Sequence, residues 1–312
     1  YAKHIFYFII FRIFLEILHI ALILMSAGFH SLWNILTQSS KNSHIFSGIK
    51  GAWLVIFAVV FFSMEGLPPR ELWVWGIVSA FLHAFYIYCL SSAYSTLDIS
   101  YVYPIARSAP ALVPVFAFVF LGERIGWPSI VGIAIILVAI YTLHFDGHLI
   151  NGFRRLYDAL LHEDFRWAFL TLFMVVFYSL WDKKAMDIFF QIAPKSVLLN
   201  GISFFFMEAG ICFILYGLYL PKKFLKEEII DRFKKEWIKG FIGAIATIGS
   251  YGLICVVFQF EAVSEVVALR QTSVLMVVFW GCFKLGEPFG KQRILSAGMI
   301  LAGVGLVGWN GR

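Results

Sequence analysis

Two stretches of the sequence repeat each other and decide the fold. Residues 106–124 read ARSAPALVPVFAFVFLGER, and residues 269–288 read LRQTSVLMVVFWGCFKLGEP. In each stretch an arginine precedes a long apolar run that ends in Leu-Gly-Glu. Arg107 lies 16 residues before Glu123 (123 − 107 = 16), and Arg270 lies 17 before Glu287 (287 − 270 = 17). The chain therefore contains two copies of one helical unit.

A second pair of motifs fixes the size of that unit. The sequence SLWN at 31–34 recurs as SLWD at 179–182, an offset of 148 residues (179 − 31 = 148). We divide the chain into a first repeat at 1–144, a linker at 145–165 and a second repeat at 166–312.

The composition is that of a membrane protein. Of the 312 residues, 61% are hydrophobic and only 14% are charged, against roughly 25% charged residues in ordinary globular chains. The net charge of +6 is not arranged as a basic stripe on a soluble face, so it suits contact with anionic lipid headgroups and not nucleic acid. These values exclude a soluble enzyme, a fibrous repeat and a disordered tail, and they predict a polytopic helical membrane protein.

Ten windows are long and apolar enough to cross a bilayer, which takes ~20 residues. They lie near 14–37, 46–63, 72–94, 98–121, 127–144, 166–190, 195–219, 237–260, 262–284 and 291–309. Two longer connections, 145–165 and 221–237, carry apolar residues at helical spacing among charged ones. Both are predicted to be amphipathic helices in the membrane interface.

Five spans in each repeat force the two repeats to face opposite ways across the membrane. This inverted arrangement is typical of secondary transporters, whose substrate site lies near the midplane between the halves. The Trp33-Asn34 pair, the YPIARS sequence at 103–108 and the FLGER sequence at 120–124 resemble the first repeat of EamA transporters in the drug/metabolite transporter superfamily. The LRQTS sequence at 269–273 and the following Leu-Gly-Glu resemble the second repeat.

The resemblance implies an all-α fold of ten transmembrane helices built as two inverted five-helix repeats. It implies a central cavity lined by helices 1, 3, 4, 6, 8 and 9, with helices 5 and 10 packed together at the back. The small residues Gly298, Ala302 and Gly305 suit a close contact between helix 10 and helix 5.

Polar side chains recur along single faces of the predicted spans. Ser26, His30, Asn34 and Gln38 follow one another every four residues in helix 1. Polar groups in a span face either a cavity or a partner helix, and we interpret this face as cavity lining, with helix–helix contact as the alternative. With the matching faces of the other helices, the predicted substrate-binding residues are His30, Trp33, Asn34, His83, Tyr86, Tyr103, Arg107, Tyr178, Asp182, Tyr251, Arg270 and Gln271.

Arg107 and Arg270 occupy matching places in the two repeats, deep inside helices 4 and 9. Two guanidinium groups could hold a carboxylate or phosphate, and Asp182 could hold an ammonium group. The alternative is a set of structural ion pairs: Arg107 with Asp98 or Glu123, and Arg270 with Glu261 or Glu265.

If transport is coupled to protons, a cavity group must change its charge. The candidates are His30 first and His83 second, because histidine titrates near neutral pH, with Glu208 as a third. Asp182 is followed directly by Lys183 and Lys184, which would keep it ionised and make it the poorest proton carrier. The sequence shows no nucleophile–base arrangement, no phosphate-binding glycine loop and no metal-ligand spacing, so we expect no metal and no cofactor.

The sequence predicts a secondary transporter of small metabolites, most simply amino acids or related zwitterionic or anionic compounds. A flippase for lipids or lipid-linked substrates is the alternative, and an intramembrane enzyme is disfavoured. The expected partners are a small-molecule substrate, membrane lipids and protons as a candidate coupling ion, with no nucleic acid, for a monomer or weak dimer. The expected location is the cell membrane, as a multi-pass protein of a bacterial inner membrane.

The orientation in the membrane has two interpretations. Basic residues counted over the connections, among them Lys41 and Lys50, favour termini outside the cell. The resemblance implies cytoplasmic termini, and the first repeat counted alone agrees with it. We expect cytoplasmic termini.

Overall fold

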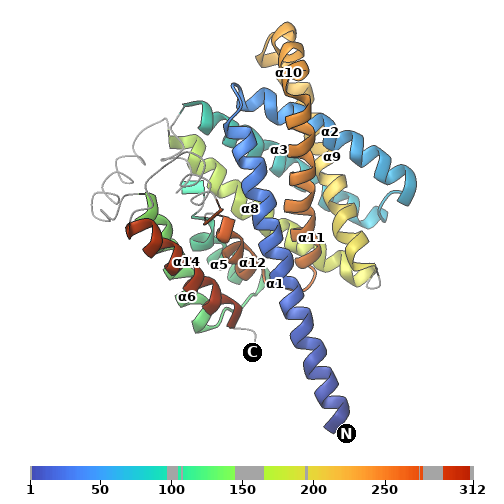
Figure 1. Cartoon of the computed structure of the whole chain (residues 1–312). Helices are drawn as coiled ribbons and strands as arrows, with labels where there is room; N and C mark the ends of the chain where they lie inside the picture. Colours follow the sequence, from blue (N-terminus) through green and yellow to red (C-terminus); the bar gives the residue numbers. More distant parts are fainter. Residues whose placement is uncertain are drawn as a thin grey trace.

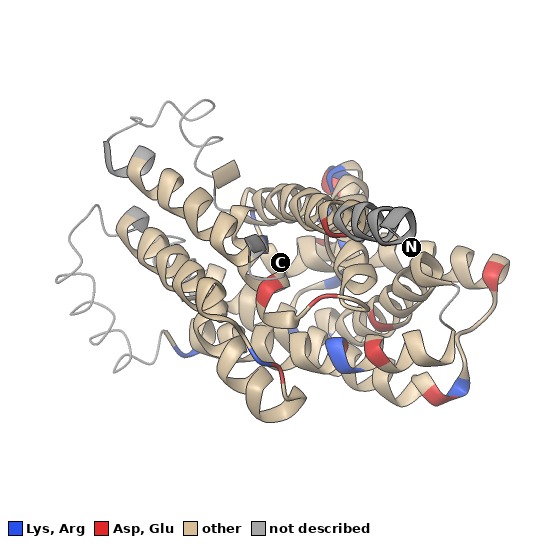
Figure 2. Ribbon diagram, turned by 90° about the horizontal axis from the view of Figure 1, so that it is seen from below, with Lys and Arg blue, Asp and Glu red and all other residues tan. Residues whose placement is uncertain are grey.

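The protein is all-α. The computed structural model describes residues 2–96, 105–106, 108–144, 165–193, 196–273, 275–276 and 291–309, and these residues contain helices and turns but no strand (Figure 1). Most of the helical ribbon carries no charged residue (Figure 2). This sparse charge is what the composition predicted, because helices that face lipid need no charged surface.

Each of the ten predicted spans overlaps a helix of the described residues. The first repeat contains α1 (Ala2–Gln38), α2 (Ser43–Glu65), α3 (Trp73–Thr96) after the short turn η1 (Arg70–Leu72), α5 (Ala109–Leu121) and α6 (Trp127–His144). The second contains α8 (Arg166–Ile192), α9 (Val197–Lys223), α10 (Lys226–Thr247), η3 (Ile248–Gly252), α11 (Leu253–Val257), α12 (Val263–Leu269), η4 (Arg270–Thr272) and α14 (Lys291–Trp309).

By length and apolarity alone, five described helical segments could cross a membrane. These are Phe14–Gln38, Ser43–Glu65, Arg70–Ser95, Val197–Lys223 and Lys226–Val257. The helices α5, α6 and α14 supply shorter apolar segments. Together with the two repeats, this makes the chain a multi-pass helical membrane protein.

The packing of the helices repeats between the halves. In chain order α1, α2, α3, α5 and α6 correspond to α8, α9, the α10–η3–α11 helix, α12 and α14. The helix α3 packs on α8, and its counterpart, the α10–η3–α11 helix, packs on α1. In the same way, α3 packs on α9 and α10 packs on α2. Three helices of the first repeat pack on their own counterparts in the second, in the pairs α2–α9, α5–α12 and α6–α14. This is the contact pattern of two halves related by a two-fold axis.

The pair α6–α14 lies at one edge of the molecule and is held by backbone contact (Figure 1). A Cβ atom added to Gly132 would lie 2.6 Å from the carbonyl oxygen of Gly303, and one added to Gly303 would lie 2.7 Å from that of Gly132. The predicted packing of helix 5 on helix 10 is confirmed, but the predicted glycines are wrong. Among the described residues nothing lies within 4 Å of such an atom on Gly298 or Gly305, because those residues face another direction.

Side chains near two helix starts explain where those helices begin. Asn42 Oδ1 accepts hydrogen bonds from the backbone N–H groups of His44 and Ile45 and so caps α2. Glu123 Oε1 accepts from the N–H of Val263, 2.8 Å away, and so caps α12 in the other repeat. The motif Gly122-Glu123 at the end of α5 therefore has a structural role.

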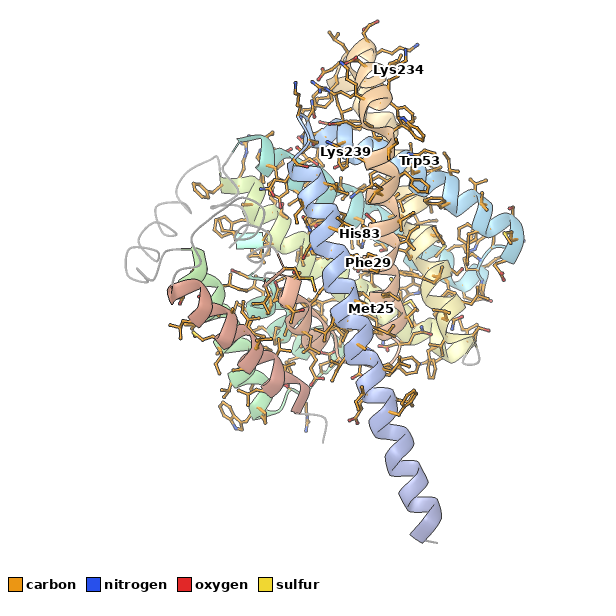
Figure 3. The ribbon with its side chains drawn as sticks, in the orientation of Figure 1. Met25, Phe29, Trp53, His83, Lys234 and Lys239 are labelled. Carbon is orange, nitrogen blue, oxygen red and sulfur yellow. The ribbon has the colours of Figure 1, made fainter. Side chains whose placement is uncertain are left out.

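The predicted interfacial helix at 221–237 is not a separate element. The helix α9 continues to Lys223 and α10 begins at Lys226, so the basic stretch forms the first turns of helix 8. This end of α10, which carries Lys234, projects beyond the rest of the bundle, whereas His83 lies near its middle (Figure 3). The basic stretch is part of helix 8 and not a separate interfacial helix because α10 packs on α2, where Trp53 Nε1 donates to the carbonyl of Trp237. The other predicted interfacial helix, 145–165, lies outside the described residues except for Phe165.

Candidate substrate cavity

A cavity with two lobes lies between the repeats. The space not filled by protein atoms is about 480 Å³ at the first lobe and about 560 Å³ at the second, and both values include space open to the outside. Four residues line both lobes, which are therefore neighbours: His30, Tyr86, Tyr178 and Arg270. All four were predicted from the sequence as substrate-binding residues.

Most of the other predicted residues also reach this cavity. Trp33, His83 and Tyr251 line the first lobe, and Asn34 and Gln271 line the second. Glu208, a predicted proton-coupling candidate, lines the first lobe as well. Tyr103 and Arg107 lie outside the described residues.

Asp182 is a predicted site residue that does not line either lobe. Its side chain is fully buried, and its two oxygens accept three hydrogen bonds. Ser79 Oγ donates to Oδ1 over 2.5 Å, Tyr251 O–H donates to Oδ2 over 2.5 Å, and His83 Nε2 lies 3.0 Å from Oδ2. Because α3, α8 and η3 each contribute one or two of these side chains, Asp182 joins three helices immediately behind the cavity wall.

The lysines that follow Asp182 do not pair with it. Lys183 Nζ donates to Asp187 over 2.6 Å and to the carbonyl of Phe258 over 2.8 Å. Consecutive residues of an α-helix point about 100° apart, so neighbours in sequence are not neighbours on one face. Lys183 therefore pairs with Asp187, one turn further along α8, and not with Asp182.

His83 stands between two carboxylates. While Nε2 faces Asp182, Nδ1 lies 3.8 Å from Glu208 Oε2. Glu208 is 3% exposed, and its Oε2 has no hydrogen-bond partner among the described residues. The imidazole therefore links a fully bonded carboxylate to one that has unused acceptor capacity and faces the first lobe.

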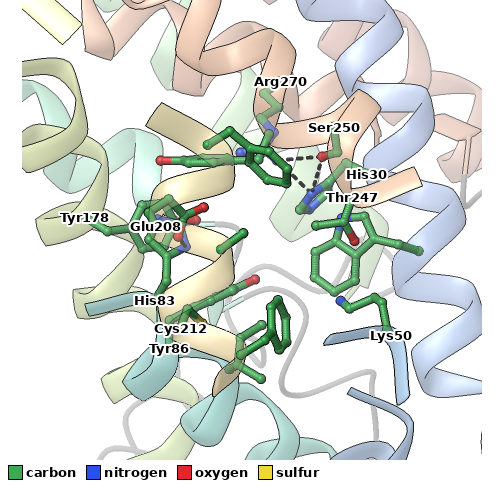
Figure 4. A pocket seen from close by; sticks show the side chains of 16 residues that line it. His30, Lys50, His83, Tyr86, Tyr178, Glu208, Cys212, Thr247, Ser250 and Arg270 are labelled. Carbon is green, nitrogen blue, oxygen red and sulfur yellow. Dashed lines mark hydrogen bonds and ion pairs between the residues drawn. The ribbon is translucent and has the colours of Figure 1, made fainter. Parts of the chain in front are cut away.

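Arg270 and His30 form the upper part of the cavity wall in Figure 4. Arg270 Nη2 lies 2.9 Å from His30 Nδ1 and 2.9 Å from Ser250 Oγ, and its guanidinium carbon lies 5.4 Å from the ring centre of Tyr251. Since arginine can only donate, His30 Nδ1 must accept, and the proton of the neutral ring is on Nε2. A proton on Nδ1 would break the bond from Arg270.

The predicted ion pairs of Arg270 do not form. Glu261 Oε1 is 2.5 Å from His19 Nδ1, and Glu265 Oε1 accepts from Ser129 Oγ over 3.4 Å. Arg270 lies in the short turn η4, whose geometry directs the side chain toward α1 and η3. Of the two alternatives that the sequence left open for Arg270, the structure has the cavity position.

Irregular backbone positions the cavity groups of helix 8. The segment η3 is a π-helical turn at Ile248–Gly252, flanked by α10 and α11. Its consecutive residues Ser250 and Tyr251 bond to Arg270 and to Asp182 respectively. A π turn inside an α-helix often marks a functional site, and irregular backbone at membrane depth is tolerated where it lines a cavity.

Helices 2 and 7 also line the first lobe, which the resemblance did not imply. Glu208, Cys212 and Phe213 come from α9, and Lys50 comes from α2. The sequence interpretation counted Lys50 among the connecting residues, and this is wrong, since Lys50 is 1% exposed in the second turn of α2. A usable signal is the sequence GIKG at 48–51, because glycines on both sides of a lysine allow other helices to approach it closely.

Comparisons with known proteins agree with this architecture. A model of the EamA-like transporter family matches residues 17–145 and 165–309. A solved crystal structure of a protein with 11% sequence identity superposes with a TM-score of 0.67, covering 95% of this chain and 98% of the other. At that identity the likeness concerns the fold alone. A search of curated proteins finds no match to the sequence.

Proposed function

Because the chain belongs to the EamA-like transporter family of the drug/metabolite transporter superfamily, we propose that it moves small zwitterionic metabolites, such as amino acids, by alternating access. Members of this family are small-molecule transporters. The proposal adds the class of substrate and the residues that bind it. It also keeps the expectation of a bacterial inner membrane.

The observation that carries the proposal is the charge distribution in the first lobe. Two cations line it, Arg270 from η4 and Lys50 from α2, and Glu208 lines it from α9 (Figure 4). Aromatic rings of Trp33, Tyr86 and Tyr178 line the same space. A small molecule that carries an ammonium group, an anionic group and an apolar body would find a complementary partner for each part.

The structure changes the role that we propose for Asp182. All three of its described hydrogen bonds come from protein side chains, so it has little left for a substrate. Glu208 has an unpartnered oxygen and faces the lobe, and we assign the ammonium group to it. Asp182 then positions His83 and Tyr251 at the cavity wall.

The two-fold packing pattern supports alternating access. Corresponding helices of the two halves make corresponding contacts, so an exchange of the two arrangements produces a second state of similar energy that opens to the other side. The cavity lies between the halves, where such an exchange changes its access.

The experiment is uptake of radiolabelled L-amino acids into liposomes that contain the purified protein. We expect accumulation of at least one amino acid, reduced at least tenfold in Arg270→Gln and Glu208→Gln. Arg70→Gln, which changes an exposed residue of η1, is the matched control and should transport normally. Transport of lipid and of no amino acid would replace this proposal by the flippase alternative.

A further inference from the structure

Lys50 is a buried cation that the described structure leaves without a counter-charge. Its aliphatic stem packs on α10, where a Cβ atom on Gly243 would lie 3.4 Å from Lys50 Cδ. A contact at this distance is an ordinary van der Waals contact, so the stem lies directly against α10 at Gly243. This packing fixes the stem and directs the ammonium group toward the first lobe.

The ammonium group lies against aromatic rings. Lys50 Nζ is 4.1 Å from the ring centre of Trp33 and 5.8 Å from that of Phe213. It makes no hydrogen bond or ion pair with any residue that the structure describes. Cation–π attraction to the indole stabilises the charge, but it fills none of the three N–H donors.

A buried ammonium group needs an acceptor, and an isolated charge away from water is costly. Lys50 lines the first lobe, so the lobe is where an acceptor can approach it. Figure 4 shows Lys50 pointing into the pocket from the side opposite Glu208 and Tyr178. An occupant with a negative group satisfies both the donors and the charge.

The surroundings favour a group with a single negative charge. Arg270 brings a second cation to the same lobe: its Nη2 donates to His30 and Ser250, and its buried Nε has no hydrogen-bond partner among the described residues. Two cations and the carboxylate of Glu208 leave one positive charge to be neutralised. Glu208 lines the same lobe and would repel a second negative charge. A carboxylate on an apolar body fits the ammonium group and the rings of Trp33 and Phe213, whereas a phosphate dianion would not be neutralised.

We propose that Lys50 is the residue that binds the carboxylate of the transported molecule, with the indole of Trp33 holding the ammonium group of Lys50 in place. This inference rests on the proposed function in taking the substrate to be zwitterionic. The inference goes beyond the proposed function by assigning the carboxylate to Lys50 on α2. Arg270 then positions His30 and Ser250.

The test uses three probes with the same branched carbon chain. L-Leucine carries both charges, 4-methylpentanoate only the carboxylate, and 3-methylbutylamine only the ammonium group. Each probe is titrated against the full-length protein in lipid nanodiscs while the thermal unfolding midpoint is measured, with sodium chloride at matched ionic strength as the blank. A ligand that binds the folded state stabilises it by RT ln(1 + [L]/Kd), so the midpoint rises with the logarithm of the ligand concentration once this exceeds Kd.

We expect 4-methylpentanoate to raise the midpoint of the wild type, and its Kd to weaken at least tenfold in Lys50→Met. Methionine keeps the length of the stem and suits the apolar surroundings, so Lys50→Met should unfold at the wild-type midpoint or above it when no probe is present. The matched control is Lys239→Met, on the exposed part of α10, which should bind as the wild type does. Arg270→Gln should weaken the binding less than Lys50→Met.

Two results would overturn the assignment of Lys50. One is a Kd for 4-methylpentanoate that stays within twofold in folded Lys50→Met; if Arg270→Gln loses binding instead, the carboxylate belongs to Arg270 and the proposed function stands. The other is a wild type that binds 3-methylbutylamine but not 4-methylpentanoate. The proposed function is tested separately, by the uptake of amino acids, and its failure would show there.

Discussion

Two contacts between the repeats differ in kind: one joins helix backbones directly, and the other is a network of polar side chains. In the α6–α14 pair the backbones of Gly132 and Gly303 touch. At the junction of α3, α8 and η3 the contact is a buried carboxylate with three hydrogen-bond partners. Close-packed backbones cannot slide past each other without losing contacts, whereas hydrogen bonds can be exchanged for new ones. The comparison indicates a fixed scaffold at the edge of the molecule and an adjustable contact beside the cavity.

The strongest test of the scaffold is Gly132→Leu. The new side chain would collide with the backbone of α14, which cannot move aside as a flexible side chain can. We expect a loss of about 3 kcal/mol in the free energy of unfolding, measured as a lower thermal midpoint in detergent. The control is Gly305→Leu on the open side of α14, which should stay near the wild type. Equal midpoints for the two variants would contradict a backbone contact at Gly132.

The corresponding test of the polar junction is Asp182→Asn. The amide keeps the shape but weakens hydrogen bonds that now go to a charged group, and we expect about 2 kcal/mol less stability. Uptake into liposomes should fall at least tenfold, because His83 and Tyr251 lose their fixed positions. Asp187→Asn removes the half-exposed partner of Lys183 and should cost less than about 0.5 kcal/mol. An active Asp182→Asn protein would refute a positioning role.

A finer comparison uses one serine from each junction. Ser79→Ala removes a 2.5 Å hydrogen bond to the carboxylate of Asp182, and we expect a cost of about 1.5 kcal/mol. Ser129 makes only long contacts at the α6–α14 pair, 3.4 Å to Glu265 and 3.5 Å to the carbonyl of Val307. Ser129→Ala should therefore cost less than about 0.5 kcal/mol. Chemical unfolding of both variants measures the difference, and a reversed order would mean that the edge depends on polar contacts.

The smallest effect on stability is expected for Glu208→Gln, since Oε2 has no hydrogen bond to lose among the described residues. The effect of Glu208→Gln should appear in the coupling of transport to protons. The groups around it are His83, then Asp182 behind the imidazole, and a proton can pass along this row. We predict that Glu208→Gln abolishes proton-driven accumulation in liposomes, whereas substrate counterflow persists at a higher KM because Glu208 also binds the ammonium group.

His30→Gln separates the two histidines. His30 Nδ1 is occupied by the guanidinium of Arg270, so the geometry favours His83 as the proton carrier, although the sequence ranked His30 first. We expect His30→Gln to keep proton-driven accumulation with an unchanged pH profile and a higher KM. A lost pH dependence in this variant would return the coupling role to His30.

The repeated motifs were sufficient to predict the fold, and most of the site residues predicted from the sequence line the cavity. His30, Asn34 and Tyr178 stand out in the sequence because polar residues are rare in such apolar helices, and because they recur at helical spacing. Lys50 was missed because α2 starts earlier than its apolar window, so a lysine near the window edge was assigned to the connection.

Other features depend on helix rotation and backbone geometry, which periodicity does not report. When every face of a helix is apolar, the pattern cannot tell which glycine meets a neighbour, and Gly303 was therefore not distinguished from Gly298 and Gly305. The bond from Tyr251 to Asp182 depends on η3, and nothing in the residues of 248–252 signals a π turn. The sequence thus predicts which side chains are unusual, but not the bonds between them.

The π turn η3 also sets the phase between the two ends of helix 8. Restoring regular α geometry over these five residues, with no residue removed, would rotate everything after the turn by about 100° relative to α10, because a π turn accommodates about one extra residue. Tyr251 would leave Asp182, although no cavity side chain had been substituted. A change of backbone geometry at this turn would therefore alter the cavity without altering any side chain that lines it, and a comparison of lining residues alone would overlook it.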